Sequence, residues 1–268
     1  ARAEAIKRGA AHPYWRDTLP GESEGIPHCH IAPIWFEWMF HIRPNLLPPG
    51  ASSCVFYVHN RTTWDAYRTL IAMAKSTGVK YLMVIEDDVF VPQETVRRLY
   101  ALLEERPDAG AAGGVYWWRR QPKDPDFPQV YLPGDGQDGA AWGGPWLRFP
   151  KDEVIQVGAG GLGCLMLRME AVRKAEALGP LFLDEFQDGD ILAHGGDLCL
   201  QRRLQGAGYR ILVDTSIKAW HRDHYTGVFY PHEASVRAQY GWPTIPLEGF
   251  GSDPRHIGAQ AMKMAKAA

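Results

Sequence analysis

The chain has 268 residues, 46% of them hydrophobic and 22% charged, with a formal net charge of −2. This is the balance of a globular protein with one sizeable core. The near-zero charge excludes a global basic field for nucleic acid, although a local groove for a polyanion stays open.

The cellular setting is inferred from two further features. No apolar run approaches the ~20 residues that a transmembrane helix needs. The four cysteines are far apart and form no CxxC pair, which is typical of a reducing compartment. We therefore expect a cytoplasmic protein without a transmembrane segment.

The first half of the chain alternates strands and helices. The predicted elements are a strand over Ser53 to His59, a helix carrying Tyr67, Leu70, Ile71 and Ala74 and ended by Gly78, a strand over Tyr81 to Ile85, and a helix after Pro92 carrying Val96, Leu99, Tyr100 and Leu103. The run Tyr81 to Ile85 is continuously hydrophobic, as in a strand buried on both faces.

The second half predicts more strands and one long loop. Strands are expected over Ala111 to Trp117, Val154 to Val157, Leu165 to Arg168 and Ile211 to Val213, a helix over Gly196 to Gly206, and a loop over 119–150. The alternation predicts an α/β fold with a central, mainly parallel sheet flanked by helices.

Three consecutive acids, Glu86, Asp87 and Asp88, follow the hydrophobic strand, at the edge where an α/β sheet binds ligands. In an extended chain Glu86 and Asp88 point to one side and Asp87 to the other. Mn²⁺ and Mg²⁺ prefer such oxygen ligands. Acids near the start of a helix are also favoured by its dipole. The acids alone leave a metal site and a solvated turn equally open.

Three features further along the chain are also candidates. The glycine-rich run Gly158 to Gly163 lies between strands, so it either lets the backbone approach a ligand or neighbouring loop closely or forms a flexible turn. Asp197 either caps a helix or accepts a proton from an attacking hydroxyl. His221 is a hydrogen-bonded residue or a ligand.

In their order, these segments resemble the glycosyltransferases of the GT-A fold, specifically family 2 and its shorter phage, bacterial and archaeal relatives. The resemblance covers about residues 25–225. The matching segments are Val58 to Arg68, Tyr81 to Asp88, Gly158 to Arg168, Phe182 to Cys199, and Gly208 to Asp214 with His221. The chain departs from the family pattern at Glu86, Gly196 and Thr69, where the family has aspartate, glutamate and often asparagine.

The resemblance implies a single Rossmann-like GT-A catalytic domain over residues 1–225, in which 1–24 form an irregular extension, followed by a C-terminal extension over 226–268. It implies a nucleotide-sugar donor, of the UDP- or GDP-sugar type, and a Mn²⁺ or Mg²⁺ ion bound by Asp88 and His221 with Glu86 assisting. The implied donor-binding residues are Asn60, Arg61, Arg68, Glu86, Asp87, Gly160 and Gly161.

The family pattern also implies a catalytic base, Asp197, and an inverting transfer to an acceptor hydroxyl, with Asp184 and Glu185 as the next candidates. A retaining transfer, in which Asp197 orients the acceptor, stays open. Four tryptophans either stack on the acceptor or pack the long loop, namely Trp117, Trp118, Trp142 and Trp146.

Two other enzymes fit the same acids and histidine, a metal-dependent phosphoester hydrolase and a nucleotidyltransferase. A carbohydrate-binding module would explain the tryptophans but not the ordered acids. The acceptor stays open among glycan, lipid-linked sugar, protein and modified nucleic-acid base.

Overall fold

The structure is a computed structural model of the chain. It describes residues 58, 63–86, 88–92, 94–118, 127–134, 142–183, 185–187, 191–194, 196–222, 229–231 and 234–243. In chain order the elements are α4 (Thr63–Thr77), β1 (Tyr81–Ile85), β2 (Val89–Phe90), α5 (Thr95–Glu105), β3 (Ala109–Val115), β4 (Trp117–Trp118), β5 (Phe127–Pro128), β6 (Val130–Pro133), β7 (Trp142–Pro145), β8 (Val154–Val157), β9 (Ala159–Gly160), β10 (Cys164–Arg168), α6 (Met169–Glu176), β11 (Glu185–Gln187), β12 (Ile191–His194), α7 (Gly196–Gly206), β13 (Arg210–Lys218), β14 (Trp220–Arg222), β15 (Phe229–Tyr230) and α8 (Ala234–Tyr240).

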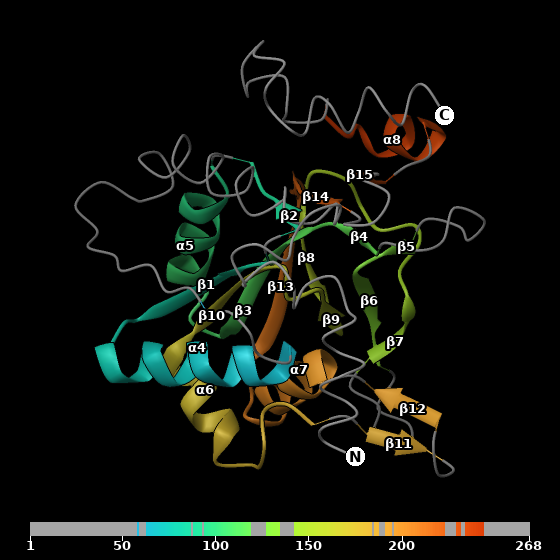
Figure 1. The fold of residues 1–268 in the computed structure, drawn as a ribbon. Helices are drawn as coiled ribbons and strands as arrows, with labels where there is room; N and C mark the ends of the chain where they lie inside the picture. The colour runs from blue at the N-terminus through green and yellow to red at the C-terminus, as the bar shows by residue number, and fades with distance from the viewer. Residues whose placement is uncertain are drawn as a thin grey trace, which may run out of the picture.

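A five-stranded sheet with the order β1-β10-β3-β13-β8 lies at the centre of the fold (Figure 1). The fold is a mixed α/β arrangement, as expected, but the prediction of a mainly parallel sheet is wrong for the described strands. Only β3 and β13 pair in parallel, whereas β10 pairs antiparallel with β1 and β3, and β8 pairs antiparallel with β13.

The reason for the difference is the position of β10. β1, β3 and β13 run in the same direction, but β10 lies between β1 and β3 and runs against both. The alternation of helix and strand that produces parallel neighbours stops after β3, because the chain then passes through β4 to β9 without a described helix.

Small residues allow β3 to lie in the middle of this sheet, where all seven of its residues are buried. A Cβ atom added at Gly113 would lie 2.8 Å from the carbonyl oxygen of Cys164, and one added at Gly114 would lie 2.5 Å from Cγ2 of Ile217. Real Cβ atoms do not approach other atoms so closely. Only glycine therefore permits these contacts.

Helices cover both faces of the sheet, with α5 on one side and α6 and α7 on the other (Figure 1). The predicted helical periods are confirmed in α4, which buries Tyr67, Ile71 and Ala74, and in α5, which buries Val96, Leu99 and Leu103. Gly78, with a φ of 68°, follows the end of α4 as predicted.

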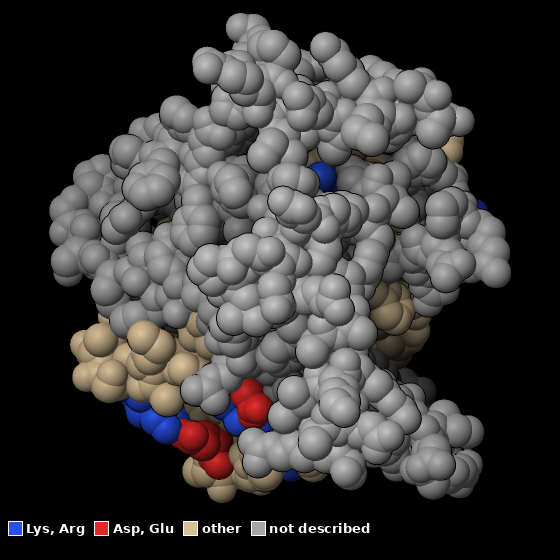
Figure 2. Space-filling model, viewed as in Figure 1, with Lys and Arg blue, Asp and Glu red and all other residues tan. Residues whose placement is uncertain are grey.

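Charged side chains of both signs lie next to one another along the edge where α4 and α6 run (Figure 2). The ion pair between Lys75 of α4 and Glu176 of α6, at 2.5 Å, joins the two helices there. This part of the surface therefore presents no field of a single sign.

Two expectations about element lengths need correction. The region 119–150, predicted as a loop, contains the strands β5, β6 and β7 among its described residues, and β13 extends well beyond the predicted Ile211 to Val213. Of the helices that the structure describes, none is both long enough and apolar enough to cross a bilayer.

Candidate metal centre

Three of the predicted side chains meet just beyond the end of β1. One ligand atom each from Glu86, Asp88 and His221 lies within 4.8 Å of the other two. Asp88 and His221 are only 5% and 6% exposed, and Glu86 is half-buried. Buried ionisable groups this close together require compensation by charge or by hydrogen bonds.

The small sheet β15-β14-β2 brings these residues together from distant parts of the chain. β14 pairs antiparallel with β2, which places His221 opposite Val89. The backbone N–H of Arg222 donates to the carbonyl oxygen of Asp88 at 2.8 Å. The position of His221 beside Asp88 is thus fixed by backbone pairing.

The backbone carbonyl of Trp117 determines which nitrogen of His221 faces the acids. Nδ1 of His221 lies 2.8 Å from this oxygen, and because a carbonyl can only accept, Nδ1 donates. Nε2 faces Oδ2 of Asp88 at 3.2 Å. A histidine that donates from one nitrogen to a carbonyl is oriented to coordinate a metal through the other.

The acids beside His221 favour a proton on its ring. Burial lowers the pKa of His221, but the charge of Asp88 and its hydrogen bond, followed by the charge of Glu86, outweigh burial and raise the pKa above its ordinary value of 6.5. The site is thus built to hold positive charge.

Two buried tyrosines surround Glu86 and were not predicted as site residues. The hydroxyl of Tyr67 donates to Oε1 of Glu86 at 2.5 Å, and the hydroxyl of Tyr116 accepts from the N–H of Gly163 at 2.9 Å. Burial, followed by the charge of Glu86, holds the pKa of each phenol well above its usual value. Both phenols are therefore neutral, and Tyr67 fixes the direction of the Glu86 carboxylate.

Asp197 lies in the first turn of α7, which begins at Gly196 as predicted. Its Oδ1 accepts from the N–H of Leu198 at 2.9 Å. Its charge also helps to raise the pKa of Tyr116, the same phenol that is affected by Glu86 and Asp88. Asp197 therefore acts electrostatically on the same phenol as the acidic cluster, and its predicted role as a base stays a prediction.

The structure provides a packing reason for Gly196, which stands where the resembling family has glutamate. A Cβ atom at this position would lie 2.9 Å from two ring atoms of Trp64. Trp64 in turn stacks on Phe182, with ring centroids 6.0 Å apart. The aromatic pair occupies the space that a larger side chain at 196 would require.

The two predicted donor-binding glycines also lie in close contacts with the protein itself. A Cβ at Gly161 would lie 2.3 Å from the Tyr116 hydroxyl. The N–H and the carbonyl of Gly160 both bond to the side-chain amide of Gln201, at 2.7 Å and 2.6 Å. These contacts link the glycine-rich turn to α7, and a contact of either glycine with a donor stays a prediction.

Arg68 and the tryptophans occupy varied environments. Arg68 donates to Asp65 at 2.9 Å and to the carbonyl of Phe182 at 2.7 Å, so its guanidinium ties α4 to that segment. Trp117 is buried, Trp118 is 46% exposed, and Trp146 is half-buried against the core. Their predicted contacts with donor or acceptor are not decided by these positions.

The remaining predicted residues cannot be placed. Asn60, Arg61, Asp87 and Asp184 lie outside the described residues, and the side chains of Glu185 in β11 and Trp142 in β7 lie outside them too.

The donor set suits a small hard or borderline cation. Two carboxylates and one imidazole are the mixture that Mn²⁺ accepts readily and that Mg²⁺ accepts when substrate oxygens complete its shell. Cys199, the nearest cysteine in sequence to Asp197, donates to the carbonyl of Pro180 and takes no part. The residues therefore fit the implied metal.

A scan against protein-family models and a search of curated proteins found no match to the chain. Similar solved structures include A197 from STIV, with a TM-score of 0.41 and 16% sequence identity over 63% of this chain and 73% of that one. A TM-score of this size carries no argument about fold or function.

Proposed function

We propose that the chain is a metal-dependent glycosyltransferase of the GT-A type. It transfers a sugar from a nucleotide-sugar donor, of the UDP- or GDP-sugar type, to an acceptor hydroxyl. The observation that carries the proposal is the convergence of Glu86, Asp88 and His221, whose ligand atoms lie within 4.8 Å of one another. The order of the sequence segments that resemble the family supports it independently.

The proposed chemistry begins with charge on the leaving group. Breaking the bond to the sugar leaves negative charge on a diphosphate, and a bound Mn²⁺ or Mg²⁺ supplies positive charge that stabilises it. Asp88 and Glu86 offer carboxylate oxygens for this ion, and His221 offers Nε2 because the Trp117 carbonyl holds its other nitrogen. Tyr67 keeps Glu86 oriented through its hydrogen bond.

Asp197 is the proposed general base. It takes the proton from the acceptor hydroxyl as the oxygen attacks the anomeric carbon. Direct attack on the face opposite the leaving diphosphate inverts the configuration at that carbon. The proposal is supported by the resemblance of the segment Phe182 to Cys199 to the family, and Asp197 lies in the first turn of α7 within that segment. Loss of such a base costs a factor of ~10²–10⁴ in rate.

The metal and the nucleotide are tested together by thermal shift. Wild-type protein is heated with UDP, GDP, ADP or CDP, each with and without Mn²⁺. We expect one diphosphate to raise the melting temperature only when Mn²⁺ is present. Asp88→Asn should lose this response, whereas Asp152→Asn, at an exposed position outside the site, should keep it.

Transfer itself is tested with the nucleotide sugars of the nucleoside diphosphate that gives the thermal shift. The measurement is the release of that nucleoside diphosphate in the presence of acceptors. Asp197→Asn should keep the metal-dependent thermal shift and lose turnover. Full turnover by this variant would show that Asp197 is not the base, and Asp184 or Glu185 would be the next candidate. Release of phosphate from simple esters without any sugar would instead support the phosphoester hydrolase, and formation of a nucleotide sugar from a nucleoside triphosphate would support the nucleotidyltransferase.

A further inference from the structure

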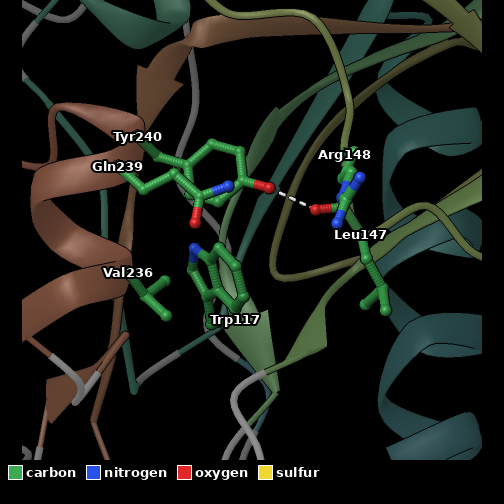
Figure 3. A pocket seen from close by; sticks show the side chains of 6 residues that line it. All are labelled: Trp117, Leu147, Arg148, Val236, Gln239 and Tyr240. Carbon is green, nitrogen blue, oxygen red and sulfur yellow. Dashed lines mark hydrogen bonds between the residues drawn. The ribbon is translucent and has the colours of Figure 1, made fainter.

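A pocket of about 240 Å³ lies between α8 and the segment that follows β7 (Figure 3). Val236, Gln239 and Tyr240 line it from α8, and Leu147 and Arg148 line it from the opposite side. The ring of Trp117, from β4, lies between the two walls.

Trp117 gives this pocket a hydrogen-bond donor without an acceptor. The residue is only 2% exposed, and in the described part of the chain its ring N–H has no hydrogen-bond partner. An indole nitrogen can only donate, and a buried donor left unpaired is unfavourable. The ring nitrogen is turned toward the α8 side of the pocket (Figure 3). It lies just beneath the pocket surface, so a ligand oxygen would satisfy it after a small shift of the side chains that cover it.

The other lining groups narrow the class of ligand. Gln239 offers an amide that both donates and accepts, and Arg148 offers guanidinium donors; both side chains are exposed. Val236 and Leu147 offer apolar surface, and the rings of Trp117 and Tyr240 lie almost wholly beneath it. A sugar ring has a matching apolar face and a rim of hydroxyl groups. A purely apolar ligand would leave the indole N–H unpaired.

Internal contacts hold the pocket in shape. The Tyr240 hydroxyl donates to the carbonyl of Leu147, and the Tyr240 ring stacks on Phe149 with centroids 4.7 Å apart. The rings of Trp117 and Tyr240 lie 5.5 Å apart. Because α8 is fixed to residues 147–149 in this way, binding requires little rearrangement.

Trp117 also connects the pocket to the metal centre. Its side chain lines the pocket, while its backbone carbonyl accepts from Nδ1 of His221 at 2.8 Å. A ring bound in the pocket is therefore separated from the metal ligands by a single residue.

We propose that this pocket binds a sugar ring of the acceptor and that α8 completes the acceptor side of the enzyme. The inference rests on the proposed glycosyltransferase function. It assigns roles to Arg148 and Gln239, which no sequence motif marks, and to a helix in the C-terminal region for which the sequence predicted no function.

The test uses an array of immobilised mono- and oligosaccharides, followed by saturation-transfer NMR with the saccharide that binds best. Gln239→Ala and Arg148→Ala remove the exposed polar groups of the pocket, so folding should be preserved. The matched controls are Gln156→Ala and Arg97→Ala, at exposed positions outside the pocket. We expect the pocket variants to bind about tenfold more weakly or worse, as for the loss of one well-placed polar contact, and the controls to bind as wild type.

Absence of binding to every saccharide, or equal affinity of wild type and both pocket variants, would overturn the pocket proposal. The Mn²⁺-dependent thermal shift of the wild type with nucleoside diphosphates reports separately on the metal centre. If that shift is absent while saccharide binding depends on Gln239 and Arg148, the pocket is a sugar site and the transferase proposal alone fails.

Discussion

β3, in the middle of the central sheet, and the candidate metal centre at the edge of that sheet differ in the polar groups that they bury. In β3 every residue is buried, and the backbone groups pair with β10 and β13 on either side. At the metal centre Asp88 and His221 are almost as buried, yet they are ionisable and lie beside a third ionisable group, Glu86. β3 contains no ionisable side chain, whereas the candidate metal centre places three of them together.

This difference is the one expected between a region arranged for stability and a candidate binding site. Two carboxylates beside one imidazole leave the candidate metal centre with excess negative charge whether or not His221 is protonated, which is unfavourable in a buried site. A divalent cation would neutralise the two carboxylates and displace any proton on Nε2. We therefore expect substitutions in the sheet to reduce stability, and substitutions at the metal centre to remove binding with little loss of stability.

The largest effect is expected from Gly113→Val in β3. Its Cβ would lie 2.8 Å from the Cys164 carbonyl and 3.0 Å from Cδ1 of Leu165, and the added methyl groups increase the overlap. We expect a loss of at least about 4 kcal/mol in the free energy of unfolding, measured by denaturant unfolding followed by circular dichroism. Gly144→Val is the control, because a Cβ there meets no atom within 4 Å. Equal stability of the two variants would contradict the packing described for β3.

A smaller loss is expected from Arg168→Met at the end of β10. Arg168 is 8% exposed and donates to the carbonyls of Leu103, Arg106 and Ala109. Methionine keeps the apolar stem but leaves these buried carbonyls unpaired, at a cost of about 2 to 3 kcal/mol. Chemical denaturation measures this cost, and Arg173→Met, at an exposed position of α6, should change stability little.

At the candidate metal centre, Glu86→Gln should weaken metal binding without reducing stability. The variant removes one negative charge and keeps an oxygen that accepts from Tyr67. Without metal we expect its unfolding free energy to equal that of the wild type or exceed it by up to about 1 kcal/mol. Mn²⁺ at a hundredfold excess over Kd should stabilise the wild type by about 2.7 kcal/mol and the variant much less.

Glu153→Gln, at an exposed position, is the matched control and should keep the full response to Mn²⁺. A large loss of stability in metal-free Glu86→Gln would show that the acidic cluster supports the fold and would remove the contrast with the sheet.

The sequence predicts the acids of the site but not the groups that orient them. Glu86 and Asp88 follow a hydrophobic strand two positions apart, so local alternation places them together. His221 is 133 residues from Asp88 and could be connected with it only through a family resemblance. Tyr67 looks like any other buried member of a helix face, and Trp117 contributes a backbone carbonyl, which every residue has.

The fold shows the same division between local and long-range information. Hydrophobic periods predict α4, α5 and the strand β1, since each depends on neighbouring residues. The prediction that β1 is buried on both faces is wrong, because its buried residues alternate with half-buried ones. The insertion of β10 between β1 and β3 depends on pairing between distant segments of the chain. Paired residues of β10 and β3 are more than fifty positions apart. The strands β6 and β7 were missed because proline and glycine, which strands usually avoid, are frequent in that region.

The smallest effect concerns Cys164, a buried polar group of the sheet that is kept neutral. Burial raises the pKa of this thiol to about 12, from an ordinary value of 9.0. The stabilisation by the neutral thiol is complete below pH 9 and is lost as the pH rises toward 12, because the unfolded thiol ionises first. Stability should therefore be unaffected at pH 8 and decline slightly by pH 9.5. Denaturant unfolding at both values should show a smaller decline in Cys164→Ala than in the wild type, and an equal decline would mean that this thiol does not titrate as a buried group.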